Sequence, residues 1–222
     1  MAREAVTLPD YWDTYKPHRG AGEQPAPEVG AFEWTQYDGH GPGVEWLGSP
    51  RTVLELGSAE GTDAVVLARS GMEVTALDFS DFQIARARRW WADVPGLRFV
   101  HAEVCDYLDT TEATYDAVFS MWGAVWFTDP EKLVPRIAKR LNSGGLLALS
   151  QAEPIEGFEG PYAMYGNGFS GRKLPFVRWS YGPEWWAGLL QRTGFTDIDA
   201  HVLPAPDPEC VGTLMVRARR TG

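Results

Sequence analysis

The residues that could do chemistry gather in one short segment, residues 52–62. An apolar run ends at Gly57, small residues continue to Gly61, and helical spacing of apolar residues starts after Thr62. This pattern predicts a buried parallel strand that turns sharply into a helix, with glycines where the turn needs a positive φ or a close approach. The first free amides of such a helix favour an anionic group. The segment therefore indicates a ligand-binding turn.

A carboxylate follows the next predicted strand. Residues 74–78 are typical of a strand that ends in Asp78. The acid comes about twenty residues after the glycines, the usual place for a group that accepts the hydroxyls of a ribose. Together, the turn and the acid predict a site for a nucleoside-containing cofactor.

The spacing of the glycines narrows the choice of cofactor. A dinucleotide fingerprint has glycines at its first, third and sixth positions, and Gly57, Ala59 and Thr62 occupy those positions here. A phosphate-binding P-loop needs a Gly-Lys-Ser/Thr tripeptide, which this sequence does not contain. At this point an ordinary strand–helix turn without a ligand remains an alternative.

Strands and helices are expected to alternate along the chain. Ser80 to Gln83 forms a capping box that starts a helix running to about Trp91, with Arg86 and Arg89 on its exposed face. Asp129 is expected to cap a further helix. The alternation predicts an α/β fold with a doubly wound, Rossmann-like sheet. The expected strands near 53–56, 74–78, 97–100, 115–120, 146–149, 196–202 and 212–218 are joined by helices that include 80–91, 130–141 and 183–193.

Two segments stand apart from this alternation. Residues 1–50 form an aromatic leader, which includes an irregular connection over 17–30 rich in proline and glycine. Residues 151–182 interleave glycines with aromatic residues and show no clear periodicity, which favours a lid. We therefore expect a leader or cap over 1–50 and a single domain over 51–222 with a lid insertion at about 151–182.

The turn resembles motif I of the class I S-adenosylmethionine-dependent methyltransferases, in which an acidic residue, a hydrophobic residue and spaced glycines follow one another. The resemblance covers roughly residues 50–218 and favours the small-molecule, secondary-metabolite branch. It implies a seven-stranded sheet that is mostly parallel, with an antiparallel last strand in a final hairpin. The residues that carry it are Glu55, Gly57, Ala59 and Gly61, then Tyr115-Asp116, the helix break at Ser143-Gly144-Gly145, and Thr193-Gly194-Phe195.

The same resemblance implies roles for individual residues. The turn residues would hold the methionine end of S-adenosyl-L-methionine, Asp78 would accept both ribose hydroxyls, and Phe79 would lie against the adenine. Glu103 and Val104 fall where the family holds the adenine amino group, and Met121 and Trp122 would face the sulfonium and the substrate. The implied cofactor residues are therefore Gly57, Ser58, Ala59, Gly61, Asp78, Phe79, Glu103, Val104 and Met121.

The acceptor substrate is expected on the aromatic side of the site. Trp122 and Trp126 follow the fourth strand, and Tyr162 and Tyr165 of the lid could hydrogen-bond a substrate, although packing roles are an alternative for the tryptophans. His40, inside a glycine-rich loop, is the candidate for a base or a substrate contact. Carboxylates and histidines show no metal-ligand spacing, so no metal is expected.

The composition of the chain limits the kinds of binding partner that are expected. The 222 residues carry 30 acidic and 20 basic side chains, a net charge of −10, which disfavours nucleic acid. Two unpaired cysteines and the lack of a signal peptide or apolar span indicate a cytoplasmic protein without a membrane partner. The sequence does not indicate an oligomeric state.

We therefore expect an enzyme that methylates N or O of a small, planar metabolite. One alternative is a nicotinamide-dependent short-chain reductase, but none of the eight tyrosines has a lysine four residues on, as that class requires. The other alternative is a protein that binds S-adenosylmethionine without methylating.

Overall fold

The computed structural model describes residues 12–13, 25–167 and 173–222. The expectations for residues 1–11, 14–24 and 168–172, including most of the irregular connection and part of the lid, lie outside the described residues. Within the described ranges, no helix is long and apolar enough to cross a membrane.

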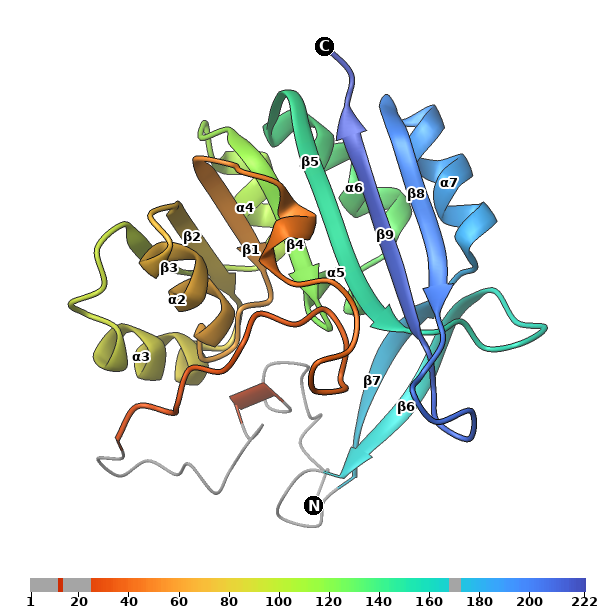
Figure 1. Cartoon of the computed structure of the whole chain (residues 1–222), viewed down its shortest axis with the longest axis horizontal. Coiled ribbons are helices and arrows are strands. Elements are labelled where there is room, and N and C mark those ends of the chain that lie inside the picture. The colour runs from red at the N-terminus through yellow and green to blue at the C-terminus, as the bar shows by residue number, and fades with distance from the viewer. Residues whose placement is uncertain (1–11, 14–24, 168–172) are drawn as a thin grey trace, which may run out of the picture.

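A seven-stranded sheet in the order β3-β2-β1-β4-β5-β9-β8 forms the centre of the molecule (Figure 1). β9 pairs antiparallel with both β5 and β8, and the remaining pairs are parallel. This confirms the predicted Rossmann-like sheet with an antiparallel last strand. The strands are β1 (Thr52–Leu56), β2 (Glu73–Asp78), β3 (Leu97–His101), β4 (Tyr115–Met121), β5 (Leu141–Ala152), β8 (Phe195–Leu203) and β9 (Thr213–Arg220).

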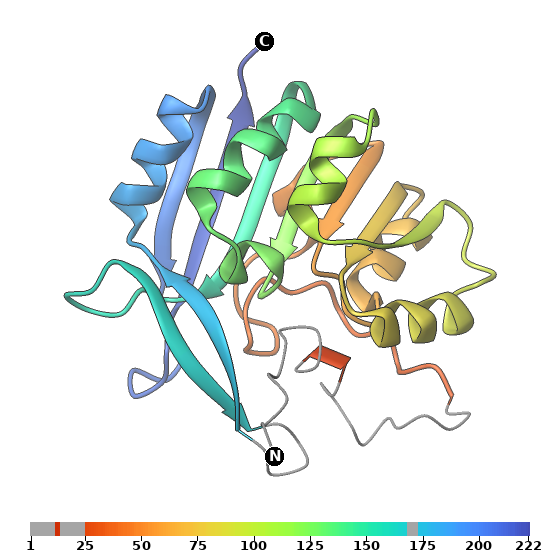
Figure 2. The ribbon, with the colours of Figure 1, turned by 180° about the vertical axis from the view of Figure 1, so that it is seen from behind.

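Helices and the leader cover the two faces of this sheet. α4, α6 and α7 lie side by side on one face (Figure 2), where their apolar residues share a core with β1, β4 and β5. On the other face, Phe32 and Trp34 of the leader pack with α2, α3 and Phe119. The helices are η2 (Val44–Leu47), α2 (Thr62–Arg69), α3 (Asp81–Trp90), α4 (Val104–Thr110), α5 (Ala124–Phe127), α6 (Pro130–Arg140) and α7 (Pro183–Arg192).

Three helix starts follow from capping residues in the local sequence. The hydroxyl of Ser80 accepts a hydrogen bond from the Gln83 N–H, and the carboxylate of Asp129 accepts one from the Glu131 N–H, as expected of N-caps. α4 was not expected, although Glu103 caps it in the same way through the Asp106 N–H. The two caps at Ser80 and Glu103 matter for function because both stand where a strand has just ended.

The structure corrects two expectations about the second half of the chain. β5 starts at Leu141 rather than near 146, because Gly144 takes a positive φ of 73° and a register shift opposite Tyr115–Ala117 absorbs the glycine pair within the strand. The lid is not irregular. It contains an antiparallel hairpin of β6 (Gly160–Asn167) and β7 (Lys173–Ser180), which projects beyond the carboxyl edge of the sheet (Figure 1).

Candidate ligand cavity at the carboxyl edge of the sheet

A cavity of about 800 Å³ opens at the carboxyl ends of β1, β2 and β4, the edge where ligands of open α/β sheets bind. Loops, α5 and β7 of the hairpin complete its wall. Of the residues predicted for a cofactor, Gly57, Ser58, Ala59, Asp78, Phe79, Glu103, Val104 and Met121 line this cavity, and so do Trp122 and Trp126.

The turn after β1 is held to the neighbouring strand by its own backbone. The amides of Gly57 and Ser58 both donate to the carbonyl oxygen of Leu77, at 2.8 and 2.9 Å. Gly57 has a φ of 84°, and a Cβ there would lie 2.4 Å from the Ala124 nitrogen. Gly123, in the turn after β4, meets β1 as closely, because its Cβ would lie 2.5 Å from the Leu56 carbonyl oxygen. The two turns therefore pack backbone against backbone, and each needs a glycine.

Ala59 and Gly61, the second and third small residues of the motif, have different surroundings from Gly57. Ala59 replaces a glycine yet keeps a positive φ of 46°, and its amide donates to Asp78 Oδ2 at 2.8 Å. Gly61 does not line the cavity. A Cβ there would lie 2.4 Å from Cε1 of Phe99, so Gly61 lets the turn pack onto that ring. Gly61 was expected to touch the cofactor, but its place in the structure is behind the turn.

Asp78 lies at the end of β2 with 8% of its surface exposed. Besides the Ala59 amide, it accepts the Ser80 N–H through Oδ1 at 2.9 Å. Burial raises the pKa of its carboxyl, and these backbone hydrogen bonds oppose the rise. The carboxylate is thus oriented by two amides and faces the cavity.

Glu55, two residues before Gly57, is 3% exposed and also lines the cavity. Its Oε2 has no hydrogen-bond partner among the described residues. Burial, and then the nearby charges of Asp63 and Asp78, raise its pKa well above the ordinary value. A cationic group bound in the cavity would stabilise the ionised form of this carboxyl.

Glu60 and Arg86 form an ion pair at 3.2 Å with side chains that are 1% and 5% exposed. The Nε1 of Trp91 also donates to the Glu60 carbonyl oxygen at 2.9 Å, so the turn is fastened to α3 twice. Arg86 was expected on the exposed face of that helix, and this expectation was wrong. The burial of Glu60 in the turn requires a cation nearby, and Arg86 supplies it.

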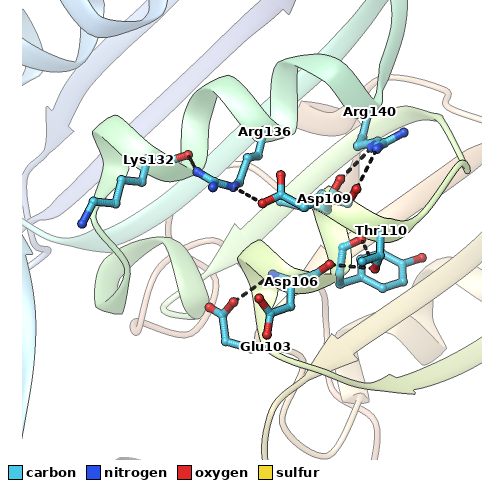
Figure 3. A network of polar contacts seen from close by, with 9 residues as sticks. Glu103, Asp106, Asp109, Thr110, Lys132, Arg136 and Arg140 are labelled. Atoms are coloured by element: carbon cyan, nitrogen blue, oxygen red, sulfur yellow. Dashed lines mark hydrogen bonds and ion pairs between the residues drawn. The ribbon is translucent and has the colours of Figure 1, made fainter.

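Glu103 reaches the cavity from the start of α4, where its Oε2 accepts the Asp106 N–H at 3.0 Å. Figure 3 shows how this helix is fastened to α6. Arg136 Nε donates to Asp109 Oδ2 at 2.9 Å, and Arg140 Nε donates to the Leu108 carbonyl oxygen at 2.7 Å. Glu103 is therefore held on a rigid support.

Aromatic rings surround the end of the cavity that follows β4. Trp122 has a positive φ of 51°, and its Nε1 donates to the Trp34 carbonyl oxygen at 3.3 Å. The ring of Trp126 lies 5.5 Å from that of Trp122, edge to face. We call this part of the cavity, around Trp122 and Trp126, the aromatic end.

Three predicted residues lie away from the cavity wall within the described chain. His40 Nε2 lies 2.9 Å from the Pro204 carbonyl oxygen, so the glycine loop packs on the turn between β8 and β9. Tyr162 packs against Phe158, and Tyr165 is 68% exposed on the hairpin. The lining residues that sequence reasoning missed include Trp12, Glu33, Lys132, Arg178 and Trp179.

The missed residues carried little signal in the sequence. Glu33 lies in the leader just before Trp34, and Arg178 is one of three cations in residues 151–182, where Val177 and Trp179 flank it. A lone charge inside an apolar stretch is the only sign that could have drawn attention to Arg178. Both segments were expected near the site, but only the three-dimensional arrangement of the hairpin and the leader shows which of their residues reach the cavity.

The fold and the cavity define a class of protein, a Rossmann-like domain with a ligand site at the end of β1, β2 and β4. Residues 53–145 match the family model described as "Methyltransferase domain". The match covers about two fifths of the chain and includes β1 to β4, among them the strands whose carboxyl ends form the cavity.

Known proteins are similar over different parts of the chain. A demethylmenaquinone methyltransferase of Clavibacter sepedonicus is 31% identical over 45% of this chain, and an S-adenosyl-L-methionine-dependent Diels-Alderase of Talaromyces variabilis is 29% identical over 70%. The matches span only 40% and 57% of those proteins.

Among solved structures, the 1,6-didemethyltoxoflavin-N1-methyltransferase of Burkholderia thailandensis has the same fold. It was determined with 1,6-didemethyltoxoflavin and S-adenosylhomocysteine bound, and it has a TM-score of 0.58 and 24% identity to this chain. The likeness covers 80% of this chain and 74% of that one.

Proposed function

We propose that the protein transfers a methyl group from S-adenosylmethionine to a nitrogen or oxygen atom of a small, planar metabolite. The observation that carries this proposal is that one cavity joins the glycine turn and Asp78 to an aromatic end around Trp122 and Trp126. Carboxylates suit the hydroxyl and ammonium groups of the polar cofactor, and flat rings suit a planar acceptor.

The residues at the turn fit this cofactor. A Cβ at Gly57 would collide with the neighbouring backbone, so the turn packs directly on the segment after β4. The unpaired, buried Oε2 of Glu55 is a ready partner for a cation, and the methionine part of the cofactor carries an ammonium group. We therefore assign the methionine end to Gly57, Ser58 and Ala59, the ribose to Asp78, and the adenine to Phe79, Glu103 and Val104.

When bound, the cofactor supplies a methyl group activated by a sulfonium. The chain itself positions the acceptor and provides a dry surface around it. Trp122 is fixed by its hydrogen bond to the Trp34 carbonyl oxygen, and Trp126 is 5% exposed, so neither ring is free to move aside. Two fixed rings can hold a flat acceptor at one angle, and such orientation is the main requirement of an in-line transfer.

We assign proton acceptance to Glu33 in place of His40. Glu33 lines the cavity and immediately precedes Trp34, whose carbonyl oxygen accepts the hydrogen bond from Trp122. Its Oε1 accepts the Gly39 N–H at 2.6 Å, which orients the group. An alcohol or phenol acceptor would use this base, whereas a neutral amine has less need of one.

A second candidate is a protein that binds S-adenosylmethionine without consuming it. The similarity to the S-adenosyl-L-methionine-dependent Diels-Alderase favours this reading, because it extends over 70% of the chain. The same cavity would then hold the cofactor beside an acceptor whose own bonds rearrange.

One experiment separates the two candidates. Calorimetry first measures binding of S-adenosylmethionine and S-adenosylhomocysteine, which both candidates require. The protein is then incubated with S-adenosylmethionine and an extract of its producing cells, and mass spectrometry follows both the cofactor and the metabolites. Methyl transfer predicts S-adenosylhomocysteine and a metabolite one CH2 heavier. Intact cofactor together with an altered metabolite of unchanged mass would favour the second candidate, and absence of cofactor binding would reject both.

A further inference from the structure

The hairpin of β6 and β7 has two faces that differ in what covers them. Residues that pair across an antiparallel ladder point to the same face, and neighbours along a strand point to opposite faces. The first face includes Tyr162, Met164, Phe176 and Arg178. The second, which we call the outer face, consists of Pro161, Ala163, Tyr165, Pro175, Val177 and Trp179.

The first face is packed on α5. Phe176 is 3% exposed, and its ring lies 5.9 Å from that of Phe127. The Cζ of Arg178 lies 3.8 Å from the centre of the Trp126 ring. The hairpin therefore places a charged side chain on its covered side.

The outer face is apolar or aromatic at all six positions, although most of it is open to solvent. Tyr165 is 68% exposed and Val177 is 39% exposed, and Pro161, Ala163 and Pro175 are exposed as well. An antiparallel hairpin that packs on one face normally alternates apolar residues on the covered side with polar residues on the open side. Exposed apolar residues that adjoin one another, rather than lying scattered, indicate a binding surface.

This outer face is continuous with the cavity. Val177 and Trp179 line the cavity together with Arg178 of the first face. Since neighbours alternate between the faces, the cavity must follow an edge of β7. Within the described residues β7 pairs with β6 alone, so this is the unpaired edge. A ligand that leaves the cavity past this edge meets Trp179 and Val177 first, and then the pair of Pro175 and Tyr165 farther along the strands.

The size and the edges of the outer face limit what can cover it. Its three cross-strand pairs span about 14 Å by 10 Å, since residues two apart in a strand are about 7 Å apart and paired strands about 5 Å apart. This is roughly a fifth of the area, about 800 Å², that each partner buries in a stable dimer. Pro161 and Pro175 also remove one N–H from each strand, which disfavours pairing with a strand of a second copy. A face of this size fits part of a small molecule.

We propose, building on the function assigned above, that the acceptor substrate is an elongated molecule with a planar ring and an apolar chain. The ring occupies the aromatic end, and the chain leaves the cavity past Val177 and lies on the outer face of the hairpin. Burial of apolar surface stabilises such a complex without any directional partner. The substrate class is therefore a phenol or aromatic amine that carries a long apolar substituent.

The test uses neutral phenols with chains of graded length. Protein saturated with S-adenosylhomocysteine is titrated with methyl, butyl and octyl 4-hydroxybenzoate by calorimetry and ligand-observed NMR. A fully buried CH2 group strengthens binding about fourfold, and a chain on an open face buries about half of each group, so the wild type should gain about twofold per CH2.

Carboxylates placed on the outer face should locate the chain, because an apolar chain would strip water from them. Val177→Asp, beside the cavity, should abolish the gain for the butyl and octyl esters. Tyr165→Asp, farther along the hairpin, should reduce the gain for the octyl ester alone. Val211→Asp is the matched control, because Val211 is 48% exposed but does not line the cavity, and it should keep the full gain.

The proposal is overturned if the wild type binds the octyl ester no better than the methyl ester, including no measurable binding of either, or if Val177→Asp keeps the full gain. Sedimentation of the same proteins tests a second copy as the occupant, and a wild-type dimer that Tyr165→Asp separates would also overturn the proposal. Affinity for S-adenosylhomocysteine is measured for every variant and shows that each is folded. Failure of the wild type to bind S-adenosylhomocysteine would instead count against the proposed function itself.

Discussion

The two ends of the cavity are built in different ways. At the glycine turn, the wall comes from residues that directly follow three neighbouring strands, and backbone amides set its geometry. At the aromatic end, the wall comes from the leader, the segment after β4, and a hairpin separate from the main sheet. The first end is shaped by main-chain packing that few side chains could alter. The second is shaped by side chains on added segments, so it can change its ligand while the fold stays the same.

The largest effect is expected from adding one methyl group to the turn, which tests whether backbone packing shapes that end of the cavity. Gly57→Ala forces both a positive φ and a collision with the Ala124 backbone nitrogen, whereas Gly71→Ala meets a φ of 93° in open space. The strained φ should lower the free energy of unfolding by about 1–2 kcal/mol in each variant. The collision should cost Gly57→Ala about 1–3 kcal/mol more and abolish cofactor binding.

Chemical denaturation and calorimetry with S-adenosylhomocysteine check this pair. Equal losses of stability in the two variants would show that backbone packing at the turn is not tight. Retained cofactor affinity in Gly57→Ala would show that the turn is not the binding surface.

A second test concerns the base at the aromatic end. If the acceptor is a hydroxyl group, Glu33→Gln should lower kcat by about 10²-fold or more, while cofactor affinity stays unchanged. The same assay on His40→Gln should show almost no change, because His40 packs on Pro204 outside the cavity. Equal rates in wild type and Glu33→Gln would mean that no base at residue 33 takes part. A large fall of kcat in His40→Gln would instead assign the role of the base to His40.

A third test concerns the acid after β2. Asp78→Asn keeps the shape of the side chain but removes the charge that would accept ribose hydroxyls. Affinity for S-adenosylhomocysteine should fall by about 10- to 100-fold, the range of hydrogen bonds to charged groups.

Asp116 provides the matched control for that change. It also accepts backbone amides, those of Arg51 and Thr52 at 3.0 Å, but it stands at the opposite end of the strands. Asp116→Asn should reduce stability and leave cofactor affinity as it was. A wild-type affinity in Asp78→Asn would remove Asp78 from the cofactor site.

A fourth test uses pH at Glu55. Because burial raises the pKa of this carboxyl, the unfolded chain loses the proton at a lower pH than the folded protein does. The contribution of Glu55 to stability is therefore full below its ordinary pKa of about 4.3 and is lost as the pH rises through the raised pKa. Between these two pKa values, ionisation of Glu55 should lower the free energy of unfolding by up to about 1.4 kcal/mol per pH unit, and Glu55→Gln should remove this dependence on pH.

The same group should couple protonation to cofactor binding. A bound ammonium would lower the pKa of Glu55, so binding should release a proton in the wild type. Calorimetry in buffers of different ionisation enthalpy measures that proton, and Glu55→Gln should release none. Equal proton release in the two proteins would show that the carboxyl is already ionised before binding.

The difference between the two ends also explains what the sequence could predict. Gly57, Ala59 and Asp78 lie within a short span of chain, and the alternation of strand and helix determines where such a span ends, so the sheet and this part of the cavity wall were predictable. Arg86 was not, because only the folded turn shows that Glu60 needs a buried partner. Glu33 and Arg178 line the cavity from segments more than a hundred residues apart, and no local sequence pattern predicts that these two segments come together.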